Sequence, residues 1–208
     1  MSTPETVIET YESIADTWAI QRNRQLIERR WLDRFLAACP RNTGRPRVVD
    51  LGCGSGAPIA RYLSERGARI TGVDASPGMC AHFAMTVPGA EAVQADMRGL
   101  DLGQRFDGIL AWNSFFHLSA GDQAAMFETF ARLADYQAAL MFTSGPSAGE
   151  AIGEVGGKPI YHASLSPEAY GELLDRAGFK VISFVAEDPE CGGHTIWLAR
   201  RRAGAEAT

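Results

Sequence analysis

The chain has 208 residues, of which 46% are hydrophobic and 22% charged, and its 20 basic and 25 acidic residues give a net charge of −5. This length predicts a single domain, and the composition excludes a disordered or fibrous chain. The acidic balance argues against a nucleic-acid-binding protein, which needs a basic face.

No basic segment followed by an apolar stretch opens the chain, so we expect no signal peptide. Its apolar runs are too short to cross a bilayer. The four cysteines form no CxxC pair and are too scattered for a disulfide framework. We therefore expect a cytoplasmic protein with neither a membrane nor a nucleic acid as partner.

Residues 1–45 are predicted to form a helical cap. Spacings of four, three and four residues place four apolar or aromatic side chains on one helix face: Val7, Tyr11, Ile14 and Trp18. A second amphipathic helix is expected around Trp31, before a break rich in proline and glycine at 40–46.

Residues 46–145 then alternate between short β-branched runs and helical patterns. The expected strands are 47–51, 69–74, 91–95, 106–112 and 138–143. The expected helices are 58–66, one that begins at Ser76, and 119–134. This alternation predicts a parallel sheet with helices on both faces, and ligands bind at the carboxyl edge of such a sheet.

The glycine-rich segment 146–165 interrupts this alternation, and we interpret it as a long loop or lid over the acceptor site. A helix follows from Ser166 to Gly178, and then two strands at 179–186 and 195–199. The short connection between these strands permits only antiparallel pairing. We therefore predict a mixed sheet in which 166–202 supply a helix and a β-hairpin, with 203–208 as a tail.

The sequence VVDLGCGSG at 48–56 follows a predicted strand and precedes a helix. Glycines in that place allow a tight turn and the close approach of a ligand to the backbone. Asp74, at the end of the next strand, is placed to bind the ribose of NAD or of another adenosine-bearing cofactor. Asp50 would repel a pyrophosphate and would suit a cationic ligand.

Four stretches carry a resemblance to a known family: DLGCGSG with Asp50, GVDASPGM with Asp74, QADMRGL with Asp96, and FDGILAWNSFFHL with His117. In their order and spacing, the chain resembles the class I S-adenosylmethionine-dependent methyltransferases from about Tyr11 to the final strand. The resemblance implies an α/β, Rossmann-like, doubly wound sheet of seven strands whose last strand is antiparallel.

The resemblance also implies site residues. S-adenosylmethionine would contact Tyr11, Trp18, Arg22, Asp50, Gly52, Cys53, Gly54, Gly56, Asp74, Ala75, Met79, Ala95, Asp96, Met97, Trp112 and Asn113. His117, and second to it His162, are the candidate catalytic bases, because imidazole titrates near neutral pH. Phe115, Phe116 and Tyr161 would form an apolar acceptor pocket. Each of these aromatic and histidine side chains has a purely structural alternative as a packing residue.

We therefore expect methyl transfer to a small-molecule acceptor by in-line displacement. The alternatives are a cofactor-binding protein without transfer, intramolecular chemistry on the cofactor, and a nicotinamide-dependent oxidoreductase. The spacing of Asp188, Cys191 and His194 could suit a metal, but a fourth ligand is missing, so we expect none. The oligomeric state is left open.

Overall fold

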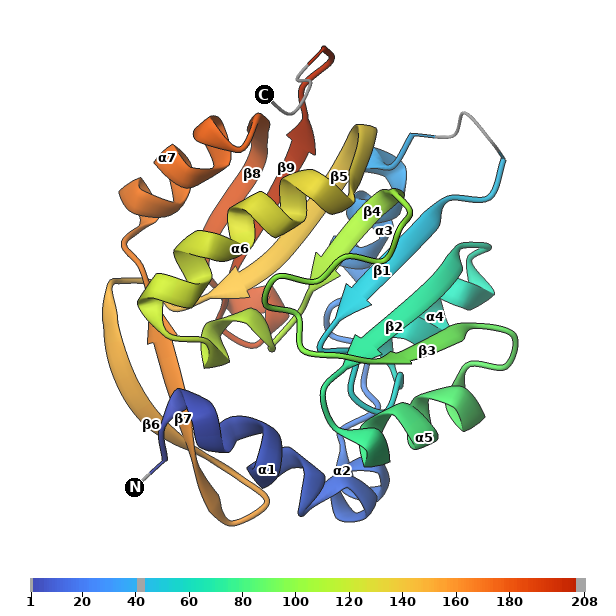
Figure 1. Ribbon diagram of the computed structural model, residues 1–208, viewed down its shortest axis with the longest axis vertical. Helices are drawn as coiled ribbons and strands as arrows, with labels where there is room; N and C mark the ends of the chain where they lie inside the picture. Colours follow the sequence, from blue (N-terminus) through green and yellow to red (C-terminus); the bar gives the residue numbers. More distant parts are fainter. Residues whose placement is uncertain (1, 41–43, 205–208) are drawn as a thin grey trace.

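The structure is a computed structural model that describes residues 2–40 and 44–204, and it contains a seven-stranded sheet with helices on both faces (Figure 1). The order in the sheet is β3-β2-β1-β4-β5-β9-β8. The strands are β1 (Arg47–Leu51), β2 (Arg69–Asp74), β3 (Glu91–Gln94), β4 (Phe106–Ala111), β5 (Ala134–Ser144), β8 (Phe179–Asp188) and β9 (His194–Arg201). β1 to β5 are parallel, whereas β9 runs antiparallel between β5 and β8. This confirms the predicted mixed sheet and its antiparallel last strand.

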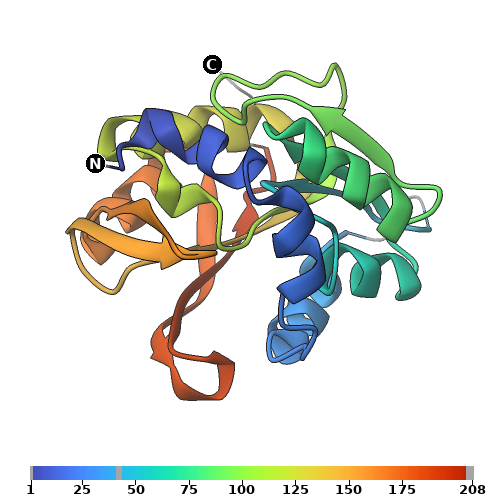
Figure 2. The same ribbon diagram turned by 90° about the horizontal axis from the view of Figure 1, so that it is seen from below.

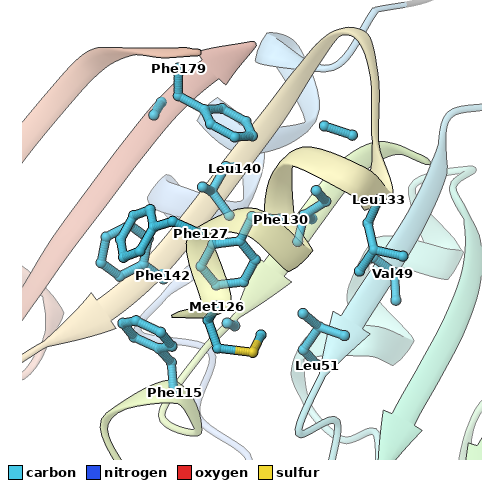
Figure 3. Packing of buried hydrophobic residues seen from close by; sticks show 14 of the residues in the cluster. Val49, Leu51, Phe115, Met126, Phe127, Phe130, Leu133, Leu140, Phe142 and Phe179 are labelled. Carbon is cyan, nitrogen blue, oxygen red and sulfur yellow. The ribbon is translucent and has the colours of Figure 1, made fainter. Parts of the chain in front are cut away.

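Helices cover both faces of the sheet. One face carries α6 (Ala120–Leu133) and α7 (Pro167–Arg176), and the other carries α3 (Arg29–Ala38), α4 (Ile59–Glu65) and α5 (Pro77–Thr86). Because both faces are covered, β4 is buried along its whole length. Figure 3 shows the packing on the first face, where Phe127 and Phe130 of α6 meet Phe142 of β5.

The amino-terminal segment forms a 3-10 helix (Pro4–Thr6), α1 (Val7–Glu12) and α2 (Ala15–Gln21). The single continuous helix expected through Trp18 is wrong, because the chain breaks at Ser13 and Ile14. The Ser13 hydroxyl donates to the Thr10 carbonyl at 2.6 Å, a local bond that competes with the helical backbone pattern. We call residues 2–21 the cap.

The cap lies across the carboxyl edge of the parallel strands, between α5 and a β-hairpin (Figures 1 and 2). Glu12 anchors it there. Its Oε2 accepts hydrogen bonds from the Ser76 hydroxyl at 2.5 Å and from the Gly78 backbone N–H at 3.0 Å, at the start of α5.

The hairpin consists of β6 (Gly149–Val155) and β7 (Lys158–Ser164), which form a separate two-stranded sheet. The long loop predicted for 146–165 is therefore wrong. Gly156 and Gly157 make the turn with φ angles of 55° and 76°, and a glycine pair with two positive φ angles favours a two-residue hairpin.

The tail predicted at 203–208 and the break at 40–46 lie partly outside the described residues. Across 2–40 and 44–204, no helix has the length and apolar character needed to cross a membrane.

Candidate active site

The glycine turn after β1 brings the ends of three parallel strands together. Gly52 has a φ of +73°, and a Cβ there would lie 2.3 Å from the Cβ of Ser114, beyond the end of β4. The Gly54 N–H donates to Asp74 Oδ2, at the end of β2, at 2.9 Å. No side chain fits at Gly52, so this turn depends on glycine for space as well as for conformation.

Asp50 lies beneath this turn with only 4% of its surface exposed. Its carboxylate accepts no hydrogen bond from the part of the chain that the structure describes. Burial, and after it the charge of Asp74, raises the pKa of Asp50 to about 7, against an opposing effect of Arg22. A buried carboxyl group without a partner is costly when ionised, so this place suits a cationic ligand.

Each carboxylate oxygen atom of Asp74 accepts a hydrogen bond from a different backbone N–H group. Oδ2 accepts from Gly54, and Oδ1 accepts from the Ser76 N–H at 3.0 Å. Burial raises the pKa of Asp74, and the two backbone donors oppose this rise. Each carboxylate oxygen keeps a further lone pair, with which it can accept a bond from a ligand hydroxyl.

A cavity of about 1100 Å³, its open mouth included, lies over the turn and beneath the cap. Every residue predicted for the cofactor lines it. Its wall also contains residues that the sequence prediction missed: Pro4, Val7, Ile8, Ser55, Ala57, Ile59, Val73, Ser76, Arg98, Ser114 and Leu118. Most of these adjoin a predicted residue along the chain and have no chemical signature of their own. We call this the first cavity.

Two lining residues carry particular chemistry. Asp96 is held by Arg98, whose guanidinium donates to both carboxylate oxygens at distances from 2.6 to 3.1 Å. The indole Nε1–H of Trp112 is buried and has no hydrogen-bond partner in the described chain. A buried donor in this state is destabilising unless a ligand satisfies it.

A second cavity of about 900 Å³, again with its mouth included, adjoins the first. The two share Tyr11, Trp18, Arg22, Asn113 and His117 as walls. The β6–β7 hairpin and the tip of the β8–β9 hairpin supply much of the remaining lining: Glu154, Val155, Ile160, His162, Glu187, Gly192, Gly193, His194 and Thr195. The sequence did not indicate that the β8–β9 tip contributes, because its place depends on the insertion of β9 beside β5.

Of the three aromatic residues predicted for the acceptor pocket, Phe116 alone lines the second cavity. Phe115 is instead fully buried against Phe127, Phe130 and Phe142. Tyr161 is 5% exposed, packs in an apolar cluster under the cap, and is not among the lining residues of either cavity.

His117 has both ring nitrogens engaged. Nδ1 lies 2.8 Å from the Tyr161 carbonyl, which can only accept, so Nδ1 carries the proton. Nε2 is then the acceptor for the Tyr11 hydroxyl at 3.0 Å. Burial lowers the pKa of His117 to about 4, although its bond to the Tyr161 carbonyl opposes this. The ring is therefore neutral at pH 7.

His162 differs from His117 in having no hydrogen bond to any residue within 2–40 or 44–204. Its ring is half-buried in the second cavity, with its centroid 5.0 Å from that of Phe116 and 4.9 Å from that of His117. Partial burial lowers its pKa. His162 thus presents a neutral imidazole whose lone pair is free.

A directed chain of hydrogen bonds fixes the opposite wall. The Thr143 hydroxyl donates to Asn113 Oδ1 at 3.2 Å, and Asn113 Nδ2 donates to His194 Nε2 at 2.9 Å. His194 Nδ1 then donates to the Cys191 carbonyl at 2.5 Å.

Asp188, the third residue of the possible metal spacing, accepts from the Trp31 indole at 2.7 Å. Within the described residues, no group of three or more His, Cys, Asp or Glu could hold a metal ion.

Comparisons with known proteins agree with this arrangement. A family model described as a methyltransferase domain matches residues 48–135. A trans-aconitate 2-methyltransferase of Escherichia coli is 38% identical over 96 residues, which are 45% of this chain and 35% of that protein. Another from the same species is 44% identical over 66 residues, or 31% of this chain and 26% of that one. The chain thus spans about a third or less of the length of these relatives.

Solved structures match over nearly the whole chain. An amino pentose methyltransferase from Micromonospora echinaspora aligns with a TM-score of 0.69 and 17% identity, over 93% of this chain and 97% of that one. Magnesium protoporphyrin IX methyltransferase from Synechocystis PCC 6803 aligns with a TM-score of 0.71 and 19% identity, over 96% and 99%. Residues 48–135 thus resemble a methyltransferase domain, and the chain shares the fold of these solved methyltransferases.

Proposed function

We propose that this chain binds S-adenosylmethionine in the first cavity and transfers its methyl group to a small molecule held in the second. The observation that carries the proposal is the wall common to both cavities, made by Tyr11, Trp18, Arg22, Asn113 and His117. A donor and an acceptor on either side of such a wall can meet at close range, which is the main requirement for in-line displacement.

The residues of the first cavity fit this cofactor. When bound, S-adenosylmethionine supplies an electrophilic methyl group on a sulfonium. The buried, unpaired carboxyl group of Asp50 suits the cationic methionine part, and the free lone pairs of Asp74 suit the ribose hydroxyls. The unsatisfied Trp112 indole offers a donor to the methionine carboxylate. Met97, beside the Asp96–Arg98 pair, offers a soft surface for the adenine ring.

We propose His162 as the group that accepts a proton from the acceptor, in preference to His117. A base needs a free lone pair directed at the acceptor. The Tyr11 hydroxyl occupies the Nε2 lone pair of His117, whereas His162 has no partner in the described chain and lines the second cavity. His117 is then a positioning residue, which holds the Tyr11 hydroxyl between the two cavities.

The acceptor is proposed to be a small molecule. The second cavity has the dimensions of a ligand pocket, and residues of the cap and of the β6–β7 hairpin line it. The relatives and solved structures named above are methyltransferases, which favours methyl transfer over a nicotinamide-dependent oxidation. The cytoplasmic location expected from the sequence stays a prediction.

Isothermal titration with S-adenosylmethionine and S-adenosylhomocysteine tests the cofactor assignment. We expect micromolar binding of both, and at least a tenfold loss in Asp50→Asn but not in Asp101→Asn, an exposed turn residue outside both cavities. If neither compound binds the wild-type protein, the proposal is wrong. Methyl transfer to trans-aconitate, the acid named for the Escherichia coli relatives, should be assayed in parallel.

A further inference from the structure

We propose that the acceptor is an amine that reaches the second cavity as an ammonium ion, and that Glu154 and Glu187 attract it. This inference rests on the proposed function and adds the chemical class of the substrate to it. It follows from the charges that face the second cavity, from the protonation of its histidines, and from the backbone of Glu187.

The charged side chains give this cavity an excess of negative charge. Glu154 on β6 and Glu187 at the end of β8 are both exposed at its lining, and neither makes a salt bridge within the described residues. Arg22 is the only basic side chain among the described lining residues. Its guanidinium lies over the Trp18 ring, 5.4 Å from the centroid, where it also lines the cofactor cavity.

Burial lowers the pKa of two histidines of the cavity, His117 and His162, and so disfavours their charged forms. The carbonyl bonds of His117 and His194 fix a proton on Nδ1, and each Nε2 accepts a hydrogen bond from Tyr11 or Asn113. Protonation of His117 Nε2 would cost the hydrogen bond from Tyr11. His162 is a neutral imidazole without a partner in the described chain. The cavity is therefore unsuited to a polycarboxylate and suited to a cation.

Glu187 lies at an irregularity in the pairing of β8 with β9, where the register shifts between Val185 and Asp188. Glu187 has a φ of +48°, a left-handed conformation that is unfavourable for glutamate. Glycine would adopt it without cost. Asn113, the other end of this wall, also has a positive φ of 50°. Among the described residues, three non-glycine residues have a positive φ, and two of them, Asn113 and Glu187, line the second cavity, whereas Gln137 does not.

The chemistry of an amine acceptor is consistent with these groups. The ammonium ion loses one proton to the free imidazole nitrogen of His162, which passes it to water. The nitrogen lone pair then forms the new N–C bond, while the C–S bond breaks and its electron pair remains on sulfur. The methylated amine leaves as an ammonium ion, so one proton is released in each turnover. Tyr11 and Phe116 are aromatic lining residues of the cavity, and aromatic rings favour a cation.

The test uses the whole protein loaded with S-adenosylhomocysteine and probes that share a carbon skeleton. Cyclohexylamine is compared with cyclohexanecarboxylate, and benzylamine with benzoate, by NMR titration up to millimolar concentrations. We expect each amine to bind at least fivefold more tightly than its acid at low salt, and the preference to shrink at 0.5 M NaCl.

The Glu154→Gln/Glu187→Gln variant should lose about fivefold in amine affinity, the scale of an exposed ion pair. Glu128→Gln, an exposed α6 residue outside both cavities, should lose none.

The possible outcomes separate the two proposals. Equal or tighter binding of the acids, no binding of any probe, or an unchanged preference in the double glutamine variant each overturns the amine assignment while the cofactor result stands. Failure of S-adenosylhomocysteine itself to bind overturns the proposed function. The Glu187→Gly variant removes the charge and also relieves the backbone strain, so it should not destabilise the fold. If this variant loses the amine preference while its thermal stability is undiminished, misfolding is excluded as the cause.

Discussion

The Tyr11 hydroxyl and His117 Nε2, 106 residues apart in the chain, are joined by a hydrogen bond of 3.0 Å at the edge of the sheet. Their rings also meet edge to face, with centroids 5.4 Å apart. This contact connects the cap to the segment that follows β4, and it lies in the wall between the two cavities.

A double-mutant cycle should measure this connection. Tyr11→Phe and His117→Leu are each expected to lower the free energy of unfolding by about 1 kcal/mol, since each leaves a buried polar partner unsatisfied. The double variant should lose about 1 kcal/mol less than the sum. Urea denaturation gives these values, with Tyr136→Phe, an exposed tyrosine outside both cavities, as control. Additivity would mean that the two residues are not coupled.

The proposed base predicts a distinct pH profile. Because burial lowers the pKa of His162 below its ordinary value, kcat/KM should be constant near pH 7 and fall only below the pH range in which an unperturbed histidine titrates. His162→Gln should lower the rate about 100-fold or more and remove this acidic limb. The control variant His82→Gln removes a contact with the exposed Asp16 outside the cavities, and it should keep both the wild-type rate and the acidic limb. An acidic limb that survives in His162→Gln would exclude this histidine as the base.

Asp50 predicts opposite effects on stability and binding. Its folded-state pKa is about 7, well above the ordinary value, so between about pH 4 and 7 the native state holds a proton that the unfolded chain has released. Stability of the unliganded protein therefore decreases as the pH rises through this range. Asp50→Asn should raise the unfolding temperature at pH 8 and leave it nearly unchanged at pH 4.5.

The same residue should make cofactor binding depend on pH. A cationic ligand favours the ionised form of Asp50, so binding should release a proton near pH 6.5 and weaken as the pH falls below 7. Titration calorimetry in buffers of different ionisation enthalpy measures that proton. Binding that releases no proton, together with an Asp50→Asn variant that is less stable at pH 8, would contradict this account.

A side chain at Gly52 would destabilise the turn in two ways, through an unfavourable backbone conformation and through a steric clash. Gly52→Ala combines a positive φ with a contact of 2.3 Å to Ser114, whereas Gly89 has a φ of +83° and open space around it. We expect Gly89→Ala to cost about 1–2 kcal/mol from conformation alone, and Gly52→Ala to cost about 1–3 kcal/mol more. Thermal unfolding compares the two variants, and equal losses would show that the contact with Ser114 relaxes freely.

Glu12 should control how long the cap stays closed. Glu12→Ala removes the bonds to Ser76 and Gly78, while Glu9→Ala changes an exposed residue on the same helix that bonds to neither. We expect faster amide hydrogen exchange in residues 2–21, and a dissociation rate of S-adenosylhomocysteine raised about fivefold, in the first variant alone. Equal exchange in both variants would rule out Glu12 as the anchor.

The sequence predicted the sheet and the first cavity well because both depend on local patterns. Asp50 and Asp74 end consecutive parallel strands, and parallel strands necessarily bring their carboxyl ends to one edge. Ser76 and Ser119 cap α5 and α6 as expected. For the strand ends and the helix caps, the residue type and its position in the sequence were sufficient for the prediction.

The second cavity was harder to predict because its walls come from elements whose placement is not local. The glycine content of 146–165 concealed a hairpin, although the pair Gly156–Gly157 is a recognisable turn signal. Phe115 and Phe116 are neighbours of one type, yet the 3-10 turn directs the first into the core and the second into the cavity. Spacing along the chain does not resolve such a difference.

The cap has a consequence for the order of events during turnover. Tyr11 and Trp18 belong to the cap and border both cavities. A ligand that orders these two side chains by binding in one cavity therefore also orders part of the wall of the other cavity. Each ligand should then bind more tightly when the other is present, by the same factor in both directions. Under the proposed function, we expect the cofactor product to leave when the cap opens, so that its release is coupled to departure of the methylated acceptor.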